Sequence, residues 1–371
     1  MTLHAPPRPD PRYGLPALLA PASLAKLVAI GAILLVFVGL FAWAGGWLST
    51  GKLDQTRMID TFQQVNGPHP GFRRNHAKGV CLVGTFESNG AGARLSRADV
   101  FKPGSVPVTG RFALAGGMPM MADGPAAVRS MALQFDLADG EVWRTGMNDI
   151  PVFPFKDPQA FYEQLATGKP DPKTGKPDPE AMKSFVAAHP EFLKAAALIR
   201  AKPFSSGFAN APYNGLNAFL FTDAARKVTP VRWSMVPVDA FEPQPADAPA
   251  DKNYLFDALA ARVAKAPAQW HLMLTVGQSG DPTNDATLPW PEGREQVDAG
   301  LLNVTRIVSE AEGNCRDINF DPLVLPAGIA GSDDPLLAAR SAAYSTSFNR
   351  REGEPKVPSA VQIQRQVSGG K

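Results

Sequence analysis

The sequence predicts an α+β protein with a largely antiparallel sheet, preceded by a single membrane-spanning helix. Three observations support this class: short strand-like runs separated by turn residues, helical segments that begin at prolines, and one long uncharged run near the N-terminus. Apolar residues make up 44% of the 371 residues, which is enough to bury a large core. The net charge of +2 gives no excess of basic residues for nucleic acid, so we expect no nucleic-acid partner.

The uncharged run covers residues 27–48 and is 22 residues long. At about 1.5 Å per residue it reaches about 33 Å, enough to cross the hydrocarbon core of a bilayer. It is longer than the apolar core of an ordinary signal peptide. Three basic residues and one acid precede it, so the positive-inside rule places the N-terminus in the cytoplasm. We therefore predict a single-pass helix in the inner (cytoplasmic) membrane, with the following domain in the periplasm. A buried core helix is the alternative.

The rest of the chain divides at this helix. Residues 1–26 are expected to form a cytoplasmic tail, and residues 49–60 a linker. Residues 61–352 are expected to form one folded domain, followed by a polar C-terminal tail over residues 353–371.

Several runs after the linker have the pattern of strands. Residues 80–86 (VCLVGTF) are mostly apolar, and residues 131–137 alternate apolar and polar side chains. Residues 218–222 and 231–238 flank a short polar turn and predict a hairpin. Residues 269–277 (QWHLMLTVG) predict a further strand.

Helical segments lie between and after these strands. Residues 158–166, 179–188 and 190–201 each begin at a proline, which favours the first turn of a helix. Residues 335–348 predict a late helix. The segment 169–179 (KPDPKTGKPDP) has the composition of a surface loop.

The two cysteines, Cys81 and Cys315, form neither a CxxC pair nor a zinc-ligand spacing. In an oxidising compartment they could form one disulfide, which requires a Cα separation of about 6 Å. Two buried thiols are the alternative.

Two settings contain candidate catalytic residues. Of the five histidines, only His76 has a suggestive context, residues 73–79 (RRNHAKG) directly before an apolar strand. Within the late helix, Arg340 and Tyr344 are four residues apart and share one face. A guanidinium beside a phenol stabilises the phenolate by charge and hydrogen bonding, which suits a tyrosine that binds iron. An ordinary exposed helix pair would have the same spacing.

These two settings resemble the distal and proximal sequences of haem catalases. Four stretches between them occur in the order found in that family: residues 110–112 (GRF), 146–153 (GMNDIPVF), 285–291 (DATLPWP) and 319–329 (NFDPLVLPAGI). The resemblance extends from residue 73 to residue 348. It implies a catalase-like antiparallel β-barrel surrounded by helices.

The resemblance also implies haem b as the cofactor, with Tyr344 as a tyrosinate ligand to the iron. Arg340 would hold the phenolate. His76 would take a proton from hydrogen peroxide and return it to the leaving oxygen, and Asn148 would donate a hydrogen bond to the peroxide.

Three further residues are implied as contacts of the haem itself. Arg73 and Arg111 would pair with the haem propionates, which need cationic partners when they are partly buried. Phe153 would pack near the haem face, and plain core packing is the alternative for this side chain.

The sequence departs from the family pattern at two site positions and at both ends. Ala113 stands where the family has the serine that orients the distal histidine, so His76 must be oriented in another way or less firmly. Asp149 replaces the second asparagine of the family's Asn-Asn pair. The long N-terminal arm and the C-terminal helical domain of full-size catalases are not found. More accessible haem is then expected, and hence a peroxidase that uses small organic reductants and has weak or no catalase activity.

Two other functions are compatible with the same residues. A catalase-fold haem enzyme can act on fatty-acid or other organic hydroperoxides as a synthase or lyase, and Ala113 together with open haem access makes this conceivable. A haem-free binding domain on the same scaffold is the third reading. The sequence leaves open whether the chain forms a homo-oligomer.

Overall fold

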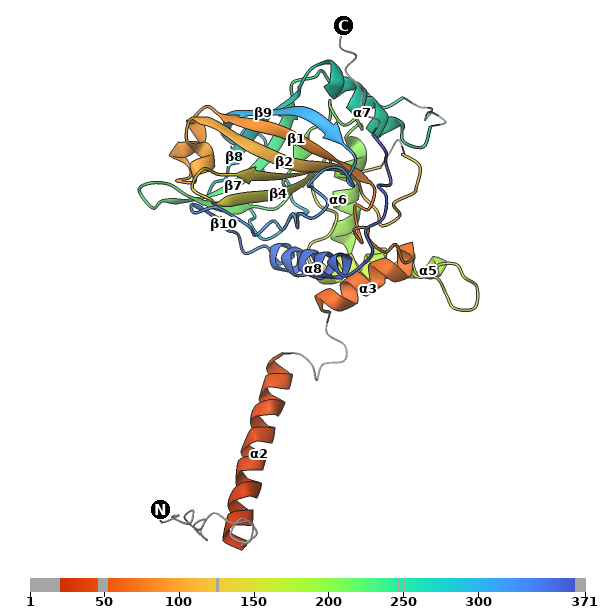
Figure 1. The fold of residues 1–371 in the computed structure, drawn as a ribbon, viewed down its shortest axis with the longest axis vertical. Coiled ribbons are helices and arrows are strands. Elements are labelled where there is room, and N and C mark those ends of the chain that lie inside the picture. The colour runs from red at the N-terminus through yellow and green to blue at the C-terminus, as the bar shows by residue number, and fades with distance from the viewer. Residues whose placement is uncertain are drawn as a thin grey trace, which may run out of the picture. The chain divides into compact units, whose positions relative to one another are not determined.

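The computed structural model describes residues 21–45, 53–124, 127–245, 247, 249 and 251–363. The chain forms two compact units, residues 1–54 and residues 55–371. In its described residues the first unit contains the helix α2, and the second contains a β-barrel with helices packed around it (Figure 1).

The helix of the first unit, α2 (Pro21–Ala44), is apolar around its whole circumference. From Leu24 to Ala44 its mean hydropathy is 2.7, and none of this stretch is buried inside the protein. Its 21 residues reach about 31 Å, long enough to cross a bilayer, although a signal sequence near the N-terminus meets the same criteria. The helix begins earlier than the predicted run, whose last residues, 46–48, lie outside the described residues.

Eight antiparallel strands close into a barrel in the second unit, as the sequence predicted. They neighbour one another in the order β7-β5-β4-β3-β2-β1-β9-β8, and β8 pairs with β7 to close the ring. Two short strands, β6 and β10, extend the sheet from β7. The strands are β1 (Gly79–Ser88), β2 (Gly104–Leu114), β3 (Arg129–Asp136), β4 (Val142–Asn148), β5 (Tyr213–Asn214), β6 (Phe219–Thr222), β7 (Val228–Pro237), β8 (Ala268–Val276), β9 (Gln296–Val308) and β10 (Ile329–Gly331).

Aromatic side chains fill the barrel. Trp143 is fully buried, stacks on Phe135 with 4.7 Å between ring centroids, and meets the edge of Trp233 at 5.2 Å. Phe112 and Trp270 pack 5.7 Å apart in the same core. Because alternate residues of a strand point to opposite faces, the remaining side chains of these strands face the outside of the barrel. A cofactor-sized ligand therefore has to bind outside it.

Four helices, α4, α5, α6 and α8, begin where the sequence predicted, whereas α3 and α7 were not predicted. Asp157 Oδ1 accepts a hydrogen bond of 2.8 Å from the backbone N of Ala160, and Asp334 Oδ1 accepts one of 2.9 Å from that of Leu336. A proline follows each capping aspartate, which suits the first helical position. The helices are α3 (Gln55–Asn66), α4 (Pro158–Thr167), α5 (Pro179–Ala188), α6 (Pro190–Ala201), α7 (Tyr254–Lys265) and α8 (Pro335–Glu352), with short 3₁₀ turns η2 (Ala91–Arg94) and η3 (Asp99–Phe101).

Two terminal segments differ from the sequence expectations. Residues 55–60, expected in the linker, lie in α3, which buries Met58 and Ile59 and packs against α8 and α4 (Figure 1). Residues 353–363, expected in the polar tail, are held at the end of β9. There Ser359 Oγ accepts a hydrogen bond of 2.6 Å from the backbone N of Ala311. The buried Ser359 anchors a segment whose polar composition suggested fraying.

Cys81 on β1 and Cys315 after β9 form a disulfide with a Cα separation of 5.5 Å. Both residues are fully buried and are 234 positions apart in the sequence. Of the two alternatives for the cysteines, the disulfide is therefore the one that the structure contains.

Candidate active site

His76 lies in a turn just ahead of β1 and has a φ of 54°, in the left-handed region that is uncommon for residues other than glycine. The Asn75 side chain supports this turn. Its Oδ1 accepts hydrogen bonds from the backbone N of His76 at 2.9 Å and from the backbone N of Gly116 at 3.0 Å. The turn thereby ties the histidine to the end of β2.

Ser130 on β3 lies between His76 and Asn148. Its Oγ is 2.9 Å from His76 Nδ1 and donates a hydrogen bond of 2.5 Å to Asn148 Oδ1. Ala113 on β2, Ser130 on β3 and Asn148 on β4 occupy directly opposed positions of the sheet. The hydroxyl that is missing at residue 113 is therefore supplied by the neighbouring strand, which is another way of orienting His76.

The imidazole of His76 is held in its neutral form. Burial lowers the pKa of His76 to about 3, and the nearby positive charges of Arg111, Arg340 and Arg73 act in the same direction. A backbone hydrogen bond with Leu114 opposes them. At neutral pH the ring can therefore accept a proton at one nitrogen, as a general base must.

Tyr344 and Arg340 lie on one face of α8, as their spacing predicted. Arg340 Nη2 donates to Tyr344 Oη at 3.4 Å and to the backbone O of Gly146 at 3.3 Å. Its Nη1 donates to Asn217 Oδ1 at 2.5 Å, and Asn217 Nδ2 donates to Asp334 Oδ2 at 2.8 Å. The guanidinium beside the phenol is thus fixed by β4 and by the capping aspartate of its own helix.

Gly146 places the tyrosine relative to the distal residues. A Cβ at this position would lie 3.4 Å from Arg340 Nη2 and 3.9 Å from Tyr344 Oη. Asn148 is two residues further along β4 and faces the same way, about 7 Å away. Opposite Gly146 on β3 is Ala132, another small residue. The two sets of candidate residues therefore stand at neighbouring levels of one outer sheet face, where the residues of the sheet between them are small.

Arg111 is buried and Arg73 is partly buried, and both already have protein partners. Arg73 Nη2 donates to the backbone O of Cys315 and of Ile318, each at 3.0 Å. Arg111 Nε donates to Glu310 Oε1 at 2.7 Å in a buried ion pair. Burial lowers the pKa of Arg73 well below its usual value, and the charges of nearby arginines lower it further. These contacts orient the two guanidinium groups.

Arg351, seven residues after Tyr344 on α8, joins this group and was not identified from the sequence. Its side chain is 2% exposed, and Nη2 donates to the backbone O of Arg316 at 3.0 Å. Arg351 Nε has no hydrogen-bond partner among the described residues. Burial and the charge of Arg111 lower the pKa of Arg351, and both Arg111 and Arg351 act on Arg73 in the same direction, so the three guanidinium groups lie close together. The buried carboxylate of Glu310 offsets part of their charge, and Glu352 and Asp317 offset part of that of Arg351. Such a cluster suits an anionic ligand.

Phe153 lies in an aromatic cluster beside the site. Its ring is 5.4 Å from that of Phe155 and 5.7 Å from that of Phe161, both with edge contacts. Its backbone N donates to the backbone O of Ala286 at 2.9 Å. These contacts show the core packing of Phe153, and its contact with a cofactor stays a prediction.

The structure thus brings His76 and Asn148 together through Ser130, and Tyr344 together with Arg340. Sequence reasoning missed Ser130, Asn75 and Arg351. The position of Arg351, two turns after Tyr344, was a usable signal, because such residues share one helix face. Ser130 could be found only once the register of β2, β3 and β4 was known.

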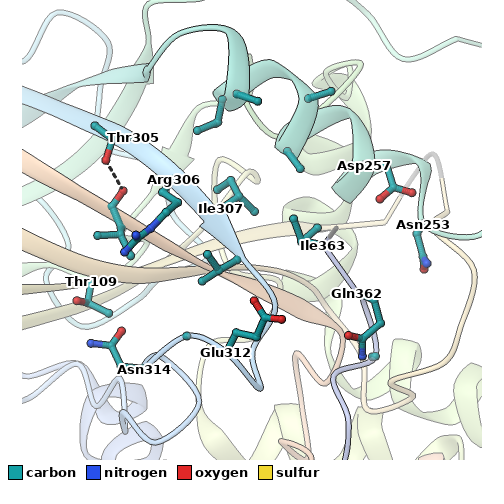
Figure 2. Close-up of a pocket in the computed structure, with 18 of the residues that line it drawn as sticks. Thr109, Asn253, Asp257, Thr305, Arg306, Ile307, Glu312, Asn314, Gln362 and Ile363 are labelled. Atoms are coloured by element: carbon teal, nitrogen blue, oxygen red, sulfur yellow. Dashed lines mark hydrogen bonds between the residues drawn. The ribbon is translucent and has the colours of Figure 1, made fainter. Parts of the chain in front are cut away.

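A large cavity of about 1220 Å³ lies elsewhere on the barrel. Figure 2 shows its lining, which includes Asp257 of α7, Arg306 and Ile307 of β9, and Ile363. It contains none of the seven residues predicted for the site. This cavity is therefore separate from the residues predicted for the site.

Two curated proteins of one name are similar to this chain over most of its length. A protein named catalase-related peroxidase from Synechococcus elongatus (strain ATCC 33912 / PCC 7942 / FACHB-805) is 36% identical over 309 residues, covering 82% of this chain and 91% of that protein. Another of the same name from Mycolicibacterium paratuberculosis (strain ATCC BAA-968 / K-10) is 31% identical, covering 82% and 96%.

Solved structures share the fold at lower identity. Catalase A from Saccharomyces cerevisiae superimposes with a TM-score of 0.69 at 18% identity, covering 84% of this chain and 70% of that chain. A bacterial catalase superimposes with a TM-score of 0.67 at 20% identity. The model of the family described as Catalase matches residues 49–357, and the chain therefore belongs to the catalase family.

Proposed function

We propose that the protein is a haem-dependent peroxidase that reduces hydrogen peroxide with a small organic electron donor. One observation carries this proposal: His76, Ser130 and Asn148 stand beside Tyr344 and Arg340 on one outer face of β3 and β4. Two relatives named catalase-related peroxidase, matched over more than 90% of their length, support peroxidase rather than catalase activity.

The residues fit a haem. Tyr344 would supply a phenolate oxygen to the iron, and the fixed guanidinium of Arg340 would stabilise that charge. Arg73, Arg111 and Arg351 would face the propionates, and the unpartnered Nε of Arg351 supports this role. Bound haem would supply the iron at which peroxide is reduced.

The chain's own groups would move the protons. Neutral His76 takes a proton from hydrogen peroxide and returns it to the departing oxygen as water forms. Asn148 holds the peroxide by a hydrogen bond from Nδ2, because its Oδ1 is occupied by Ser130. The ordered amide lowers the entropic cost of aligning the substrate.

The location proposed from the sequence also has structural support. α2 is exposed along its whole apolar length, which is unfavourable in water and favourable in a bilayer. A disulfide is typical of an oxidising compartment. We therefore assign α2 as a membrane anchor and place the catalytic unit in the periplasm.

The lipid hydroperoxide alternative loses one of its two arguments. That alternative depended in part on the absence of the orienting serine at Ala113, and Ser130 supplies a hydroxyl to His76 from the next strand. Oxidation of a donor such as guaiacol with hydrogen peroxide should therefore exceed turnover of a fatty-acid hydroperoxide.

The decisive test is haem binding by the full chain in detergent micelles. The wild type should bind one haem b with a tyrosinate-type ferric spectrum. Tyr344→Phe should change that spectrum or lose the haem, and Tyr254→Phe, a tyrosine of α7, is the matched control. An unchanged spectrum for Tyr344→Phe would refute the ligand assignment.

The second test addresses proton transfer. His76→Gln should keep its haem and react with hydrogen peroxide about 100-fold or more slowly, because general acid–base catalysis contributes on that order. His271→Gln, at a half-exposed pair with Asp298, should react like the wild type. Equal rates for His76→Gln and the wild type would contradict the assignment of His76.

A further inference from the structure

We propose that Ser130 is a positioning residue that fixes the tautomer of His76 and the amide orientation of Asn148 together, through one shared hydroxyl proton. The effect of Ser130 on catalysis rests on the proposed function. Its hydrogen bonds to His76 and Asn148 join protein groups alone and do not depend on that function. Ser130 lies on β3, the strand next to the one that carries Ala113.

The hydroxyl has two partners and one proton. Ser130 Oγ is 2.5 Å from Asn148 Oδ1 and 2.9 Å from His76 Nδ1. An amide oxygen only accepts hydrogen bonds, so the hydroxyl donates to Asn148. Its lone pair must then accept a hydrogen bond from His76, which requires a proton on Nδ1. In the neutral ring the other nitrogen, Nε2, is left with its lone pair.

The two consequences serve the same reaction. The lone pair on Nε2 can take a proton from peroxide, and Asn148 Nδ2 is free to donate to the peroxide oxygen. If the amide turned over, Nδ2 would donate to Ser130 and the hydroxyl would donate to Nδ1. The proton would then move to Nε2, and Asn148 would present an acceptor. Ser130 thus couples the tautomer of His76 to the amide orientation of Asn148. When one of them is in the form that suits the peroxide reaction, the other is as well.

The sheet register explains why a serine at 130 reaches both groups. Ser130 is directly opposite Asn148 on β4 and directly opposite Ala113 on β2. Residues opposed on neighbouring strands have Cβ atoms about 5 Å apart, within the reach of a hydroxyl and an amide. Ala113, one strand further away, is not paired with β4. A serine at residue 113 would therefore be a poorer link to Asn148.

The closing experiment reads the tautomer directly. ¹⁵N-histidine spectra of the haem-free full chain in micelles contain five imidazoles, and loss of one signal in His76→Gln assigns His76. The wild type should show His76 protonated at Nδ1. In Ser130→Ala the population should shift to the Nε2-protonated form, and Ser130→Thr should restore the wild-type pattern. Ser88→Ala, a serine at the far end of β1, is the matched control.

The kinetic arm uses the haem-loaded chain. Ser130→Ala should react with hydrogen peroxide about 10- to 100-fold more slowly, a part of what the base itself contributes. Its thermal midpoint should change little. Adding Ala113→Ser to Ser130→Ala should restore the rate only in part, because a hydroxyl on β2 does not hold Asn148.

The outcomes separate the two proposals. An unchanged His76 tautomer in Ser130→Ala would overturn the role of Ser130 whether or not the protein is a peroxidase. Full rescue by Ala113→Ser would overturn the link to Asn148. A tautomer shift in a protein that, as wild type, binds no haem would leave the role of Ser130 standing and would refute the proposed function.

Discussion

Reduction of the disulfide between Cys81 and Cys315 should destabilise the catalytic unit strongly. The bond closes a loop of 234 residues. In the chain-entropy description, a cross-link over a loop of this length lowers the entropy of the unfolded chain and so raises its free energy by about 5 kcal/mol at 25 °C. Measured losses for native disulfides are about 2–5 kcal/mol, so we expect a value within this range.

Urea unfolding of the full chain in micelles, followed by tryptophan fluorescence, measures this loss. With a slope of about 3 kcal/mol per molar urea, a loss of about 2–5 kcal/mol should lower the midpoint by about 0.7–1.7 M. A Cys81→Ala, Cys315→Ala variant is the control, because its midpoint should be low and should not respond to reductant. Oxidised and reduced wild type unfolding at the same urea concentration would refute the reasoning.

The same bond should also affect the site. The backbone O of Cys315 accepts a hydrogen bond of 3.0 Å from Arg73, so the bond fixes β1 against the segment that orients this arginine. We expect weaker haem binding after reduction, even under conditions in which the protein stays folded. Haem titration with and without reductant measures this effect, and identical affinities would contradict it.

Three further predictions concern single residues. Gly146→Val should lower haem affinity about 10-fold or more while the barrel stays folded, because its side chain would enter the space beside Arg340 and Tyr344; haem titration checks this, and an unchanged affinity would count against it. Burial raises the pKa of Asp149 from 3.8 to about 6, so this group stabilises the fold most below pH 3.8, and about 3 kcal/mol is lost as the pH rises through 6. The free energy of unfolding of Asp149→Asn, measured with urea, should not show this loss between pH 3.8 and 6. If the free energies of variant and wild type changed with pH in parallel, the prediction would be wrong. Asn75→Ala should cost about 1–2 kcal/mol and slow the peroxide reaction, since two backbone N–H groups lose their acceptor; urea unfolding and stopped-flow mixing measure both, and wild-type values would exclude the role.

Patterns among neighbouring residues predicted several helix starts and one hairpin. The helices α5 and α6 begin at Pro179 and Pro190 as expected, because the residues that start a helix are adjacent in the sequence. The hairpin of β6 and β7 was also predicted, since its turn separates two apolar runs. The resemblance to catalases gave the barrel, which short-range patterns alone do not specify.

The disulfide, the role of Ser130 and the burial of α3 could not be predicted, because each depends on contacts between residues that are distant in the sequence. The pairing of Cys81 with Cys315 requires a Cα separation that the sequence does not contain. The role of Ser130 follows from the register of three strands, and a shift of one residue would have turned it into the barrel. Residues 55–60, the first half of α3, were assigned to the linker, and the burial of α3 against α8 is a tertiary effect.

The two halves of the site come from distant parts of the folded unit, with His76 ahead of β1 and Tyr344 in α8, 268 residues later. During synthesis His76, to which we assign proton transfer, therefore emerges long before Tyr344, to which we assign iron binding. An incomplete chain has the imidazole without the phenol oxygen that would retain a porphyrin. On the proposed assignment, a growing chain can therefore bind and use haem only after α8 has been made.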